Sequence, residues 1–237
     1  MVLILNIETS TEVCSVSLAE NGNLVVLKES NEGFNHSKSV TVFIEEIFKG
    51  NNLKINALDA VAVSKGPGSY TGLRIGVSVA KGLCYGLNIP LISVCSLEMM
   101  AVHTARNLEK YLPGRSTLPF LFCPMIDARR MEVYTALYNS GGEEIRPVSA
   151  EIIDDNFLSG FFGTHQILIF GNGAEKCKDR LNHKNAYLAG PNSTSAQFMQ
   201  AISEAKFKKQ EFEDIACFEP FYLKNFVATI PKDKILK

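Results

Sequence analysis

Two short segments contain residue types that could bind a phosphate group. Glu8-Thr9-Ser10-Thr11 combines one carboxylate with three hydroxyl groups. Such a set can hold a metal–phosphate group, but hydroxyl groups in a turn commonly satisfy their own backbone, and on this pattern alone we favour the turn. Residues 66–76 (GPGSYTGLRIG) place glycines ahead of a predicted helix, where free N–H groups and the helix dipole favour an anion. The segment is not a Walker A loop, because no lysine follows these glycines.

The glycines inside that predicted helix allow a second interpretation. Gly72, Gly76 and Ala80 are spaced four residues apart and therefore share one face of the helix. A glycine inside a helix costs about 1 kcal/mol relative to alanine, which indicates that the small side chains serve close packing. The neighbour could be another element of the same lobe or a second subunit. The residues alone do not decide between packing within the lobe and packing against a second subunit. They favour each of these two interpretations over anion binding.

Two other segments could do chemistry, whereas the common zinc and nucleophile motifs are absent from the sequence. Residues 127–130 (DARR) end a predicted strand, and the arginines could meet RNA phosphate or a partner's carboxylate, or could lie in a solvated turn. The segment 171–174 (GNGA) contains Gly171 and Gly173 and could support a nucleotide base, although a turn is the ordinary interpretation. The four histidines have no spacing typical of a zinc site, and no G-x-S-x-G nucleophile motif occurs.

Composition and charge narrow the class of protein. The chain has 237 residues, of which 46% are hydrophobic and 21% charged, values typical of a folded globular protein. The net charge of −1 excludes a strongly basic nucleic-acid binder acting alone, but not RNA bound jointly with a basic partner. The six cysteines include no C-x-x-C pair, the first residues lack the basic start of a signal peptide, and no apolar run is long enough to span a membrane. We therefore expect a cytoplasmic protein with reduced thiols.

The periodicity of apolar residues predicts the elements that position these groups. In the first half we expect a three-stranded meander, followed by helices that alternate with two further strands. The same order repeats in the second half, and an acidic residue, Glu8 or Asp127, ends the first strand of each. The expected strands are 2–8, 13–19, 24–29, 58–64, 89–94, 120–127, 132–138, 144–148 and 166–170, and the expected helices are 36–49, 71–87, 96–108, 154–162, 174–181 and 195–207.

This repeated order predicts an α/β protein of two lobes that face a cleft. Residues 111–119 are rich in proline and glycine and make the best boundary. We assign residues 1–110 to an N-terminal lobe and 111–119 to a linker. Residues 120–223 would form a C-terminal lobe with shorter helices, and 224–237 a basic, partly flexible tail.

The segments GPGSYTGLRIG (66–76) and ILNIETST (4–11) resemble those of the TsaB (YeaZ) family of bacterial proteins, which take part in forming threonylcarbamoyladenosine in tRNA. The likeness covers most of the chain and is strongest through about residue 101, with looser agreement at 127–134, 171–174 and 218–224. It implies two ribonuclease-H-like lobes of the actin/Hsp70/sugar-kinase (ASKHA) type, with the second lobe reduced.

The resemblance also implies what the chain lacks. TsaB proteins are related to the catalytic subunit TsaD and to the glycoprotease-like M22 peptidases, and TsaD carries two metal-binding histidines where this sequence has Ser96 and Met100. Neither side chain replaces imidazole as a ligand. The second phosphate turn of TsaD is replaced here by Ala128-Arg129-Arg130. The resemblance therefore implies no catalytic residue, no metal and no cofactor. A remnant of a nucleotide site would comprise Glu8, Thr9, Ser10, Thr11, Gly171 and Gly173.

The resemblance finally implies partners. Helices 36–49 and 71–87 resemble those that pair with TsaD, so the chain would be a non-catalytic scaffold or activator in a heterodimer that the ATPase TsaE joins. The isolated chain would form a homodimer through the same surface, tRNA would be met only through the complex, and no membrane is involved. Replacing Gly72 and Gly76 by leucine would abolish pairing and leave the monomer folded. The implied interface residues are His36, Val40, Phe43, Ser69, Tyr70, Gly72, Arg74, Gly76, Val77 and Ala80.

Two enzymatic functions are the alternatives. An M22-type metallopeptidase would need the metal histidines that Ser96 and Met100 replace. An ASKHA phosphotransferase would need a glycine at Ala128 so that the backbone could approach a phosphate.

Overall fold

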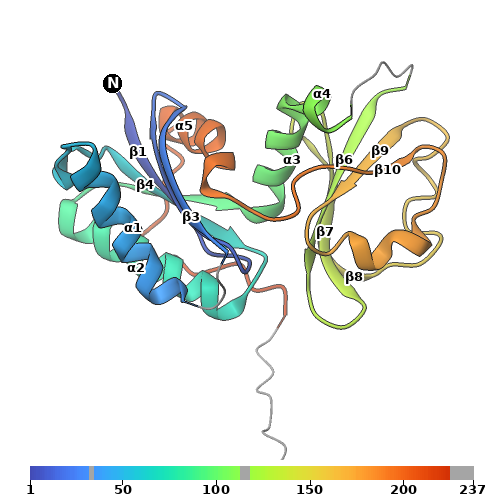
Figure 1. Cartoon of the computed structure of the whole chain (residues 1–237), viewed down its shortest axis with the longest axis horizontal. Helices are drawn as coiled ribbons and strands as arrows, with labels where there is room; N and C mark the ends of the chain where they lie inside the picture. Colours follow the sequence, from blue (N-terminus) through green and yellow to red (C-terminus); the bar gives the residue numbers. More distant parts are fainter. Residues whose placement is uncertain (32–34, 113–117, 225–237) are drawn as a thin grey trace, which may run out of the picture.

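The computed structural model describes residues 1–31, 35–112 and 118–224, which form two lobes side by side, each built on a five-stranded mixed sheet (Figure 1). The strand order is β3-β2-β1-β4-β5 in the first sheet and β10-β9-β6-β7-β8 in the second. Read from its other edge, the second order becomes β8-β7-β6-β9-β10, so β6 takes the place of β1 and the topologies agree. The chain is thus an α/β protein of two ribonuclease-H-like lobes of the ASKHA type, which confirms the predicted fold.

The first sheet begins with the predicted meander. Its strands β1, β2 and β3 are antiparallel, and Asn21 and Gly22 turn between the last two with positive φ angles of 49° and 74°. Two further strands run parallel to the first, because a helix carries the chain back over the sheet before each of them. The five strands are β1 (Leu3–Glu8), β2 (Cys14–Glu20), β3 (Asn23–Ser30), β4 (Ala60–Gly66) and β5 (Leu91–Cys95).

Two helices cover one face of this sheet. They are α1 (His36–Gly50) and α2 (Tyr70–Leu87), which contact each other as well as the strands. Their apolar residues recur at helical spacing and fill one core together with the strand residues beneath them. A short 3-10 helix η1 (Ile55–Ala57) leads from α1 into β4.

The second lobe repeats the sheet with less helix around it. Its strands are β6 (Phe120–Asp127), β7 (Glu132–Asn139), β8 (Glu144–Ile152), β9 (Gln166–Phe170) and β10 (Ala186–Leu188). Its own helical element is the 3-10 helix η2 (Glu175–Arg180). The helix α3 (Ser96–Arg106) contacts both sheets and lies between the lobes, followed by the short α4 (Leu108–Tyr111) (Figure 1). The core around α3 therefore holds the two lobes together.

The structure corrects several predicted helices. Residues 154–162 form successive turns, because the Asp154 side chain accepts the Asn156 N–H and turns the chain locally. The helix predicted at 174–181 is the 3-10 helix η2, and the one at 96–108 divides into α3 and α4. The helix predicted at 195–207 divides into the 3-10 helix η3 (Ala196–Phe198) and α5 (Gln200–Lys208). The strand β10 was not predicted, because three residues carry too little pattern.

The last part of the chain returns to the first lobe, although the sequence placed it in the second. Helix α5 contacts β1 and β5, and an isolated bridge joins Glu213 to Leu91 at the edge of the first sheet. Phe218 packs against the core beneath α1 and α2. The predicted linker and tail lie largely outside the described residues. None of the helices in the described ranges combines the length and apolarity needed to cross a membrane.

Candidate functional site

The predicted nucleotide remnant in the first lobe is a closed turn. Glu8 is the last residue of β1, and Thr9, Ser10 and Thr11 form the turn that follows. All four are between 0% and 6% exposed. Thr194, far along the chain, covers them, since its hydroxyl group donates to Glu8 Oε1 at 3.2 Å and lies 2.8 Å from Thr11 Oγ1. The turn that could have held a phosphate group is therefore filled by the chain itself.

Glu8 is a buried carboxyl group that forms no ion pair with any residue in the described ranges. Burial raises its pKa above the ordinary value, although the Ser10 N–H and hydroxyl groups nearby oppose the shift. Its Oε2 atom, like the Ser10 hydroxyl, has no hydrogen-bond partner among the described residues. The same burial, reinforced by Glu8, raises the pKa of the Cys14 thiol to about 12. Burial thus disfavours the ionised form of Glu8, which is the form that binds a metal.

Gly72 and Gly76 pack against another element of the same lobe, which is one of the two arrangements that the residues alone left open. A Cβ atom on Gly72 would lie 2.0 Å from the carbonyl oxygen of Thr9, and one on Gly76 would lie 2.3 Å from Thr9 Oγ1. Val77 and Ala80 on the same face are 5% and 0% exposed. Gly72 and Gly76 therefore fix α2 against the turn that follows β1, and Val77 and Ala80 pack into the core of the lobe.

The other predicted interface residues divide between the core and the surface. His36 and Val40 are buried in α1, and His36 Nε2 lies 2.8 Å from the Thr11 carbonyl oxygen. Phe43 is half-buried against the core. Ser69 is exposed, and its hydroxyl accepts the Gly72 N–H to cap α2.

Tyr70 and Arg74 mark the outer face of α2, where α1 and α2 enclose a shallow groove of about 540 Å³. The guanidinium of Arg74 lies over the Tyr70 ring, 5.4 Å from its centroid. Farther along the same face, a Cβ atom on Gly82 or Gly86 would meet nothing within 4 Å. The groove is lined by Ser37, Tyr70, Thr71, Arg74, Ile75, Ser78 and Val79.

Gly82 and Gly86 were missed by the sequence analysis. Each costs helix stability without an intramolecular contact that needs a glycine, unlike Gly72 and Gly76. Ser78, Gly82 and Gly86 follow one another at intervals of four residues, so the outer face carries its own row of small residues. That spacing was a signal in the sequence, but two rows on one helix cannot be assigned to inner and outer faces without the fold.

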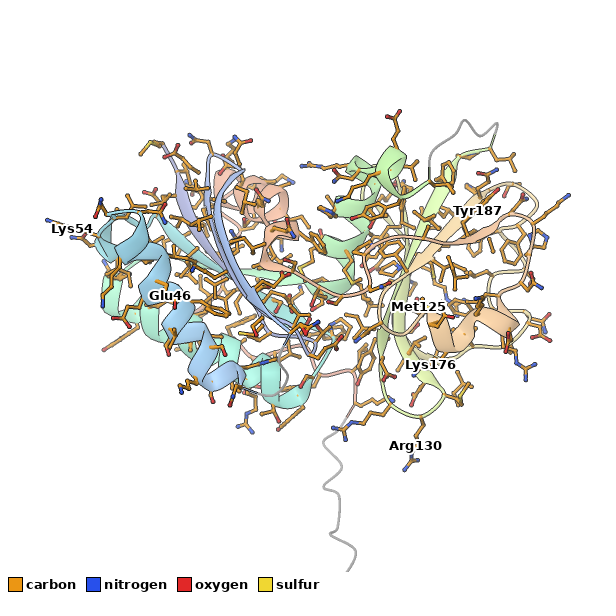
Figure 2. The ribbon with its side chains drawn as sticks, in the orientation of Figure 1. Glu46, Lys54, Met125, Arg130, Lys176 and Tyr187 are labelled. Carbon is orange, nitrogen blue, oxygen red and sulfur yellow. The ribbon has the colours of Figure 1, made fainter. Side chains whose placement is uncertain are left out.

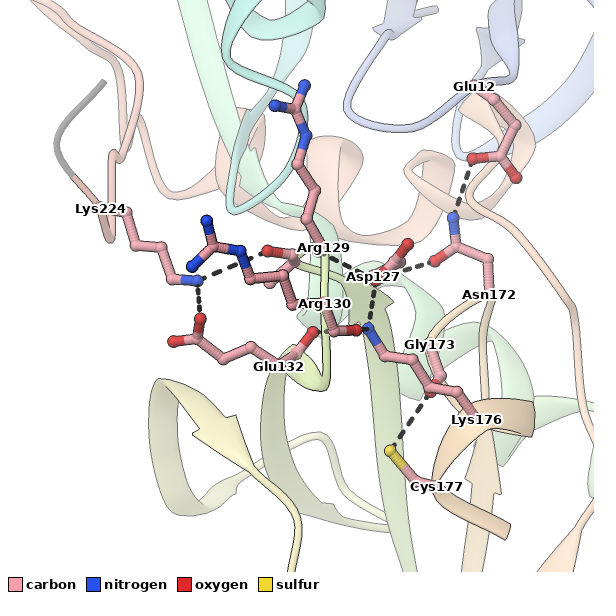
Figure 3. Close-up of polar contacts among 11 residues, drawn as sticks. Glu12, Asp127, Arg129, Arg130, Glu132, Asn172, Gly173, Lys176, Cys177 and Lys224 are labelled. Atoms are coloured by element: carbon pink, nitrogen blue, oxygen red, sulfur yellow. Dashed lines mark hydrogen bonds and ion pairs between the residues drawn. The ribbon is translucent and has the colours of Figure 1, made fainter. Parts of the chain in front are cut away.

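The equivalent turn of the second lobe has its carboxylate neutralised. Asp127 ends β6 as Glu8 ends β1, and it forms an ion pair with Lys176 (Figure 3). Lys176 Nζ also donates to the carbonyl oxygens of Arg130 at 3.0 Å and Glu132 at 2.7 Å. Lys176 is a further residue that sequence analysis did not single out, because nothing in its spacing relates it to Asp127.

The predicted base-supporting glycines pack against β6. A Cβ atom on Gly171 would lie 2.2 Å from the Met125 carbonyl oxygen, and one on Gly173 would lie 2.9 Å from a Val133 methyl group. Between them, Asn172 accepts the Asp127 N–H at 2.9 Å and donates to Glu12 Oε2 at 2.8 Å. Asn172 thus joins the two lobes, which places residues 8–12 and 171–173 on facing sides of the same junction.

The positions of the absent metal histidines are unsuited to a metal. Ser96 and Met100 begin α3 and are both fully buried, and Met100 belongs to the core shared by the lobes. A search of the described residues finds no group of three or more histidine, cysteine, aspartate or glutamate side chains that could hold a metal ion. The side chains at these positions therefore do not fit the metal of a TsaD-type site.

Comparisons with known proteins agree with this geometry. A family model described as tRNA N6-adenosine threonylcarbamoyltransferase (TsaD) matches residues 33–157. The tRNA threonylcarbamoyladenosine biosynthesis protein TsaB of Escherichia coli K12 is 30% identical over 241 residues, covering 95% of this chain and 96% of that protein. The TsaB of Haemophilus influenzae is 35% identical over 136 residues, which cover 55% of this chain and 51% of that protein.

A solved structure has the same fold. YeaZ from Pseudomonas aeruginosa superposes with a TM-score of 0.79 over 94% of this chain and 100% of that one. Its sequence identity to this chain is 23%. The agreement therefore concerns the two-lobed architecture.

Proposed function

The chain belongs to the TsaB family of tRNA threonylcarbamoyladenosine biosynthesis proteins, and from that premise we propose that it is a non-catalytic subunit that pairs with TsaD. It would bind TsaD more tightly in its active conformation and so favour transfer of the threonylcarbamoyl group to tRNA. TsaE would join this pair, and a homodimer would form when TsaD is absent.

The outer face of α2 carries the proposal. A helix that pairs closely with another needs small residues in a row, and Ser78, Gly82 and Gly86 form such a row on the exposed side. The groove beside it adds half-buried Ile75 and Val79 as apolar contacts. We therefore assign the partner surface to the exposed row Ser78, Gly82 and Gly86, on a different face of α2 from Gly72 and Gly76.

The two carboxyl groups that end the first strand of each lobe are already engaged within the chain, which supports a scaffold. The Glu8 carboxyl is buried beneath Thr194, and the Asp127 carboxylate is occupied by Lys176. Neither is placed to hold a metal–phosphate group. The two alternative functions, peptidase and phosphotransferase, would each require such a group or the histidines that this chain does not have.

Reconstitution tests the role in the complex. The chain is mixed with TsaD, TsaE, tRNA, ATP and threonylcarbamoyl-adenylate, and modification of the tRNA is followed with and without the chain. We expect modification to stop when only this chain is omitted. Unchanged modification would contradict the proposal.

A pair of matched variants tests the surface. Ser78→Arg with Gly82→Arg adds two bulky cations to the outer face of α2, where there is open space and arginine favours the helix. We expect this variant to lose co-purification with TsaD while keeping its fold. The control Ser159→Arg with Gly160→Arg makes the same two changes at an exposed turn of the second lobe. Retained pairing in the first variant would contradict the surface.

A further inference from the structure

Two consecutive arginines between β6 and β7 adopt a backbone conformation that disfavours them. Arg129 and Arg130 have φ angles of 67° and 53°, in the left-handed region where glycine and asparagine are usual. Three of the other left-handed non-glycine residues among those described are asparagines, which tolerate it. Strained residues of this kind persist where the surroundings fix them and often mark functional sites.

The arginine turn, which we define as residues 128–132, is fixed by hydrogen bonds and ion pairs from side chains on both sides of it. The Arg129 N–H donates to Asp127 Oδ1 at 3.0 Å, and Lys176 donates to the Arg130 carbonyl oxygen at 3.0 Å. On the other side, Lys224 forms an ion pair with Glu132 and a long hydrogen bond to the Ala128 carbonyl oxygen (Figure 3). These contacts offset the conformational free energy of the two left-handed residues. None of them involves a guanidinium group of Arg129 or Arg130.

Both arginine side chains are exposed and available. Within the described residues neither guanidinium has an ion pair or a hydrogen bond. Figure 3 shows the two groups extending in different directions, and Figure 2 shows Arg130 at the outer edge of the molecule. Two guanidinium groups that point in different directions can each bind a separate anionic group, whereas they cannot both bind one carboxylate.

A pair of stacked aromatic rings on the first lobe lies close along the chain to Lys224. The Tyr222 ring lies against Tyr70, with centroids 4.7 Å apart, and Arg74 covers the Tyr70 ring. Tyr222 is two residues from Lys224, which reaches the arginine turn, so the Cα atoms of these two residues are at most about 7 Å apart. The chain therefore passes from the stacked rings to the residue that contacts the arginine turn within two positions, where it crosses between the lobes.

We propose that the arginine turn binds phosphate groups of the RNA substrate in the assembled complex. The inference rests on the proposed function, which supplies RNA as the polyanion. Arginine forks match phosphate geometry and are typical of phosphate recognition. Because the chain has a net charge of only −1, the attraction is confined to this patch. RNA would then be contacted directly by this subunit, which changes the sequence-based expectation of indirect contact.

The test uses the complex of this chain with TsaD and an in vitro transcribed tRNA. The variant Arg129→Asn with Arg130→Gly removes both forks and supplies residues that suit the left-handed turn, so folding is preserved. The control Arg106→Asn with Arg180→Asn removes two exposed arginines elsewhere. A third variant, Arg129→Lys with Arg130→Lys, keeps the charge and loses the forks. Dissociation constants are measured by fluorescence anisotropy from 50 to 300 mM salt.

The dependence on salt is the readout. If two phosphate contacts are lost, the slope of log Kd against log salt falls by about 1.4 to 1.8, and binding weakens about tenfold or more. The lysine variant should keep most of the slope, and the arginine control should match the natural chain. An unchanged slope in the Asn-Gly variant would overturn the proposal.

Pairing with TsaD is measured on the same samples. The Asn-Gly variant should pair normally. Loss of pairing would overturn the inference in favour of arginine contacts to acidic residues of TsaD. A natural chain that does not pair with TsaD at all would overturn the proposed function instead.

Discussion

Thr9 and Gly72 are joined so closely that no side chain fits between them. The Thr9 hydroxyl donates to the Gly72 carbonyl oxygen at 2.8 Å, while a Cβ atom on Gly72 would lie 2.0 Å from the Thr9 carbonyl oxygen. The start of α2 is therefore seated directly on the turn that ends β1. This contact explains the glycine-rich segment as a packing device within one lobe.

Alanine substitutions at two positions of the same helix should have opposite effects. Gly72→Ala forces a Cβ atom into backbone and should lower the free energy of unfolding by about 3 kcal/mol. Gly82→Ala meets open space and should raise it by about 1 kcal/mol, because alanine favours the helix. Urea denaturation of the two variants measures both changes. Equal effects would show that α2 is seated differently.

The Gly72→Leu, Gly76→Leu variant expected from sequence to spare the fold should instead unfold the first lobe. Both leucines would enter the space of Thr9, whose backbone cannot move without breaking the β1–β2 pairing. Far-ultraviolet circular dichroism and a loss of cooperative melting would show it. A normal melting curve would restore the original expectation.

Glu8 should make stability depend on pH in a particular direction. Its pKa is raised by burial above the 4.5 of an ordinary glutamate, so the folded state holds the proton more tightly than the unfolded chain. The stabilising contribution is complete below pH 4.5 and is lost as the pH rises toward the folded pKa. Glu8→Gln removes the titration. We expect the natural chain to lose unfolding free energy relative to this variant as the pH rises above 4.5.

Glu45 serves as a control, because its pKa is shifted in the opposite direction from that of Glu8. Its pKa is lowered by the Lys49 side chain, so its contribution is present above pH 4.5 and is lost as the pH falls. Glu45→Gln should therefore differ from the natural chain least in acid. Parallel pH profiles for Glu8→Gln and the natural chain would show that the pKa of Glu8 is not raised by folding.

Removing the Thr194 hydroxyl should destabilise the junction between the segments it joins. Thr194→Val keeps the shape of the side chain but leaves the buried Glu8 and Thr11 oxygens with one partner fewer. The expected loss is about 1 to 3 kcal/mol of unfolding free energy. Thr41→Val, at an exposed position of α1, should change stability by less than about 0.5 kcal/mol. Similar losses of unfolding free energy in both variants would contradict the hydrogen bonds that we assign to Thr194.

The arginine turn should be more stable with residues that suit it. Arg129→Asn with Arg130→Gly relieves two left-handed arginines and should raise the free energy of unfolding by about 1 kcal/mol. Thermal melting of this variant against the natural chain measures the change. A lower melting temperature would mean that the arginine side chains stabilise the fold themselves.

The sequence determined much of the fold through local pattern. Strands β6 and β9 have the predicted bounds, because short apolar runs between turn residues leave little freedom. Asn21-Gly22 predicted its hairpin for the same reason, and the repeated order of elements predicted two equivalent sheets. The segment 154–162 failed as a helix because the Asp154 side chain turns the backbone locally, and a weak apolar period did not outweigh it.

Only the tertiary structure decided which groups meet. Thr194 reaches Glu8 across 186 positions, and Lys176 reaches Asp127 across 49, distances at which one sequence carries no pairing signal. The inward and outward rows of α2 look alike in sequence, since Gly76 and Gly82 are the same residue type. What separates them is the Thr9 turn, present on one side of the helix and absent from the other. Periodicity records that a helix has faces, and the neighbours packed against it decide what each face does.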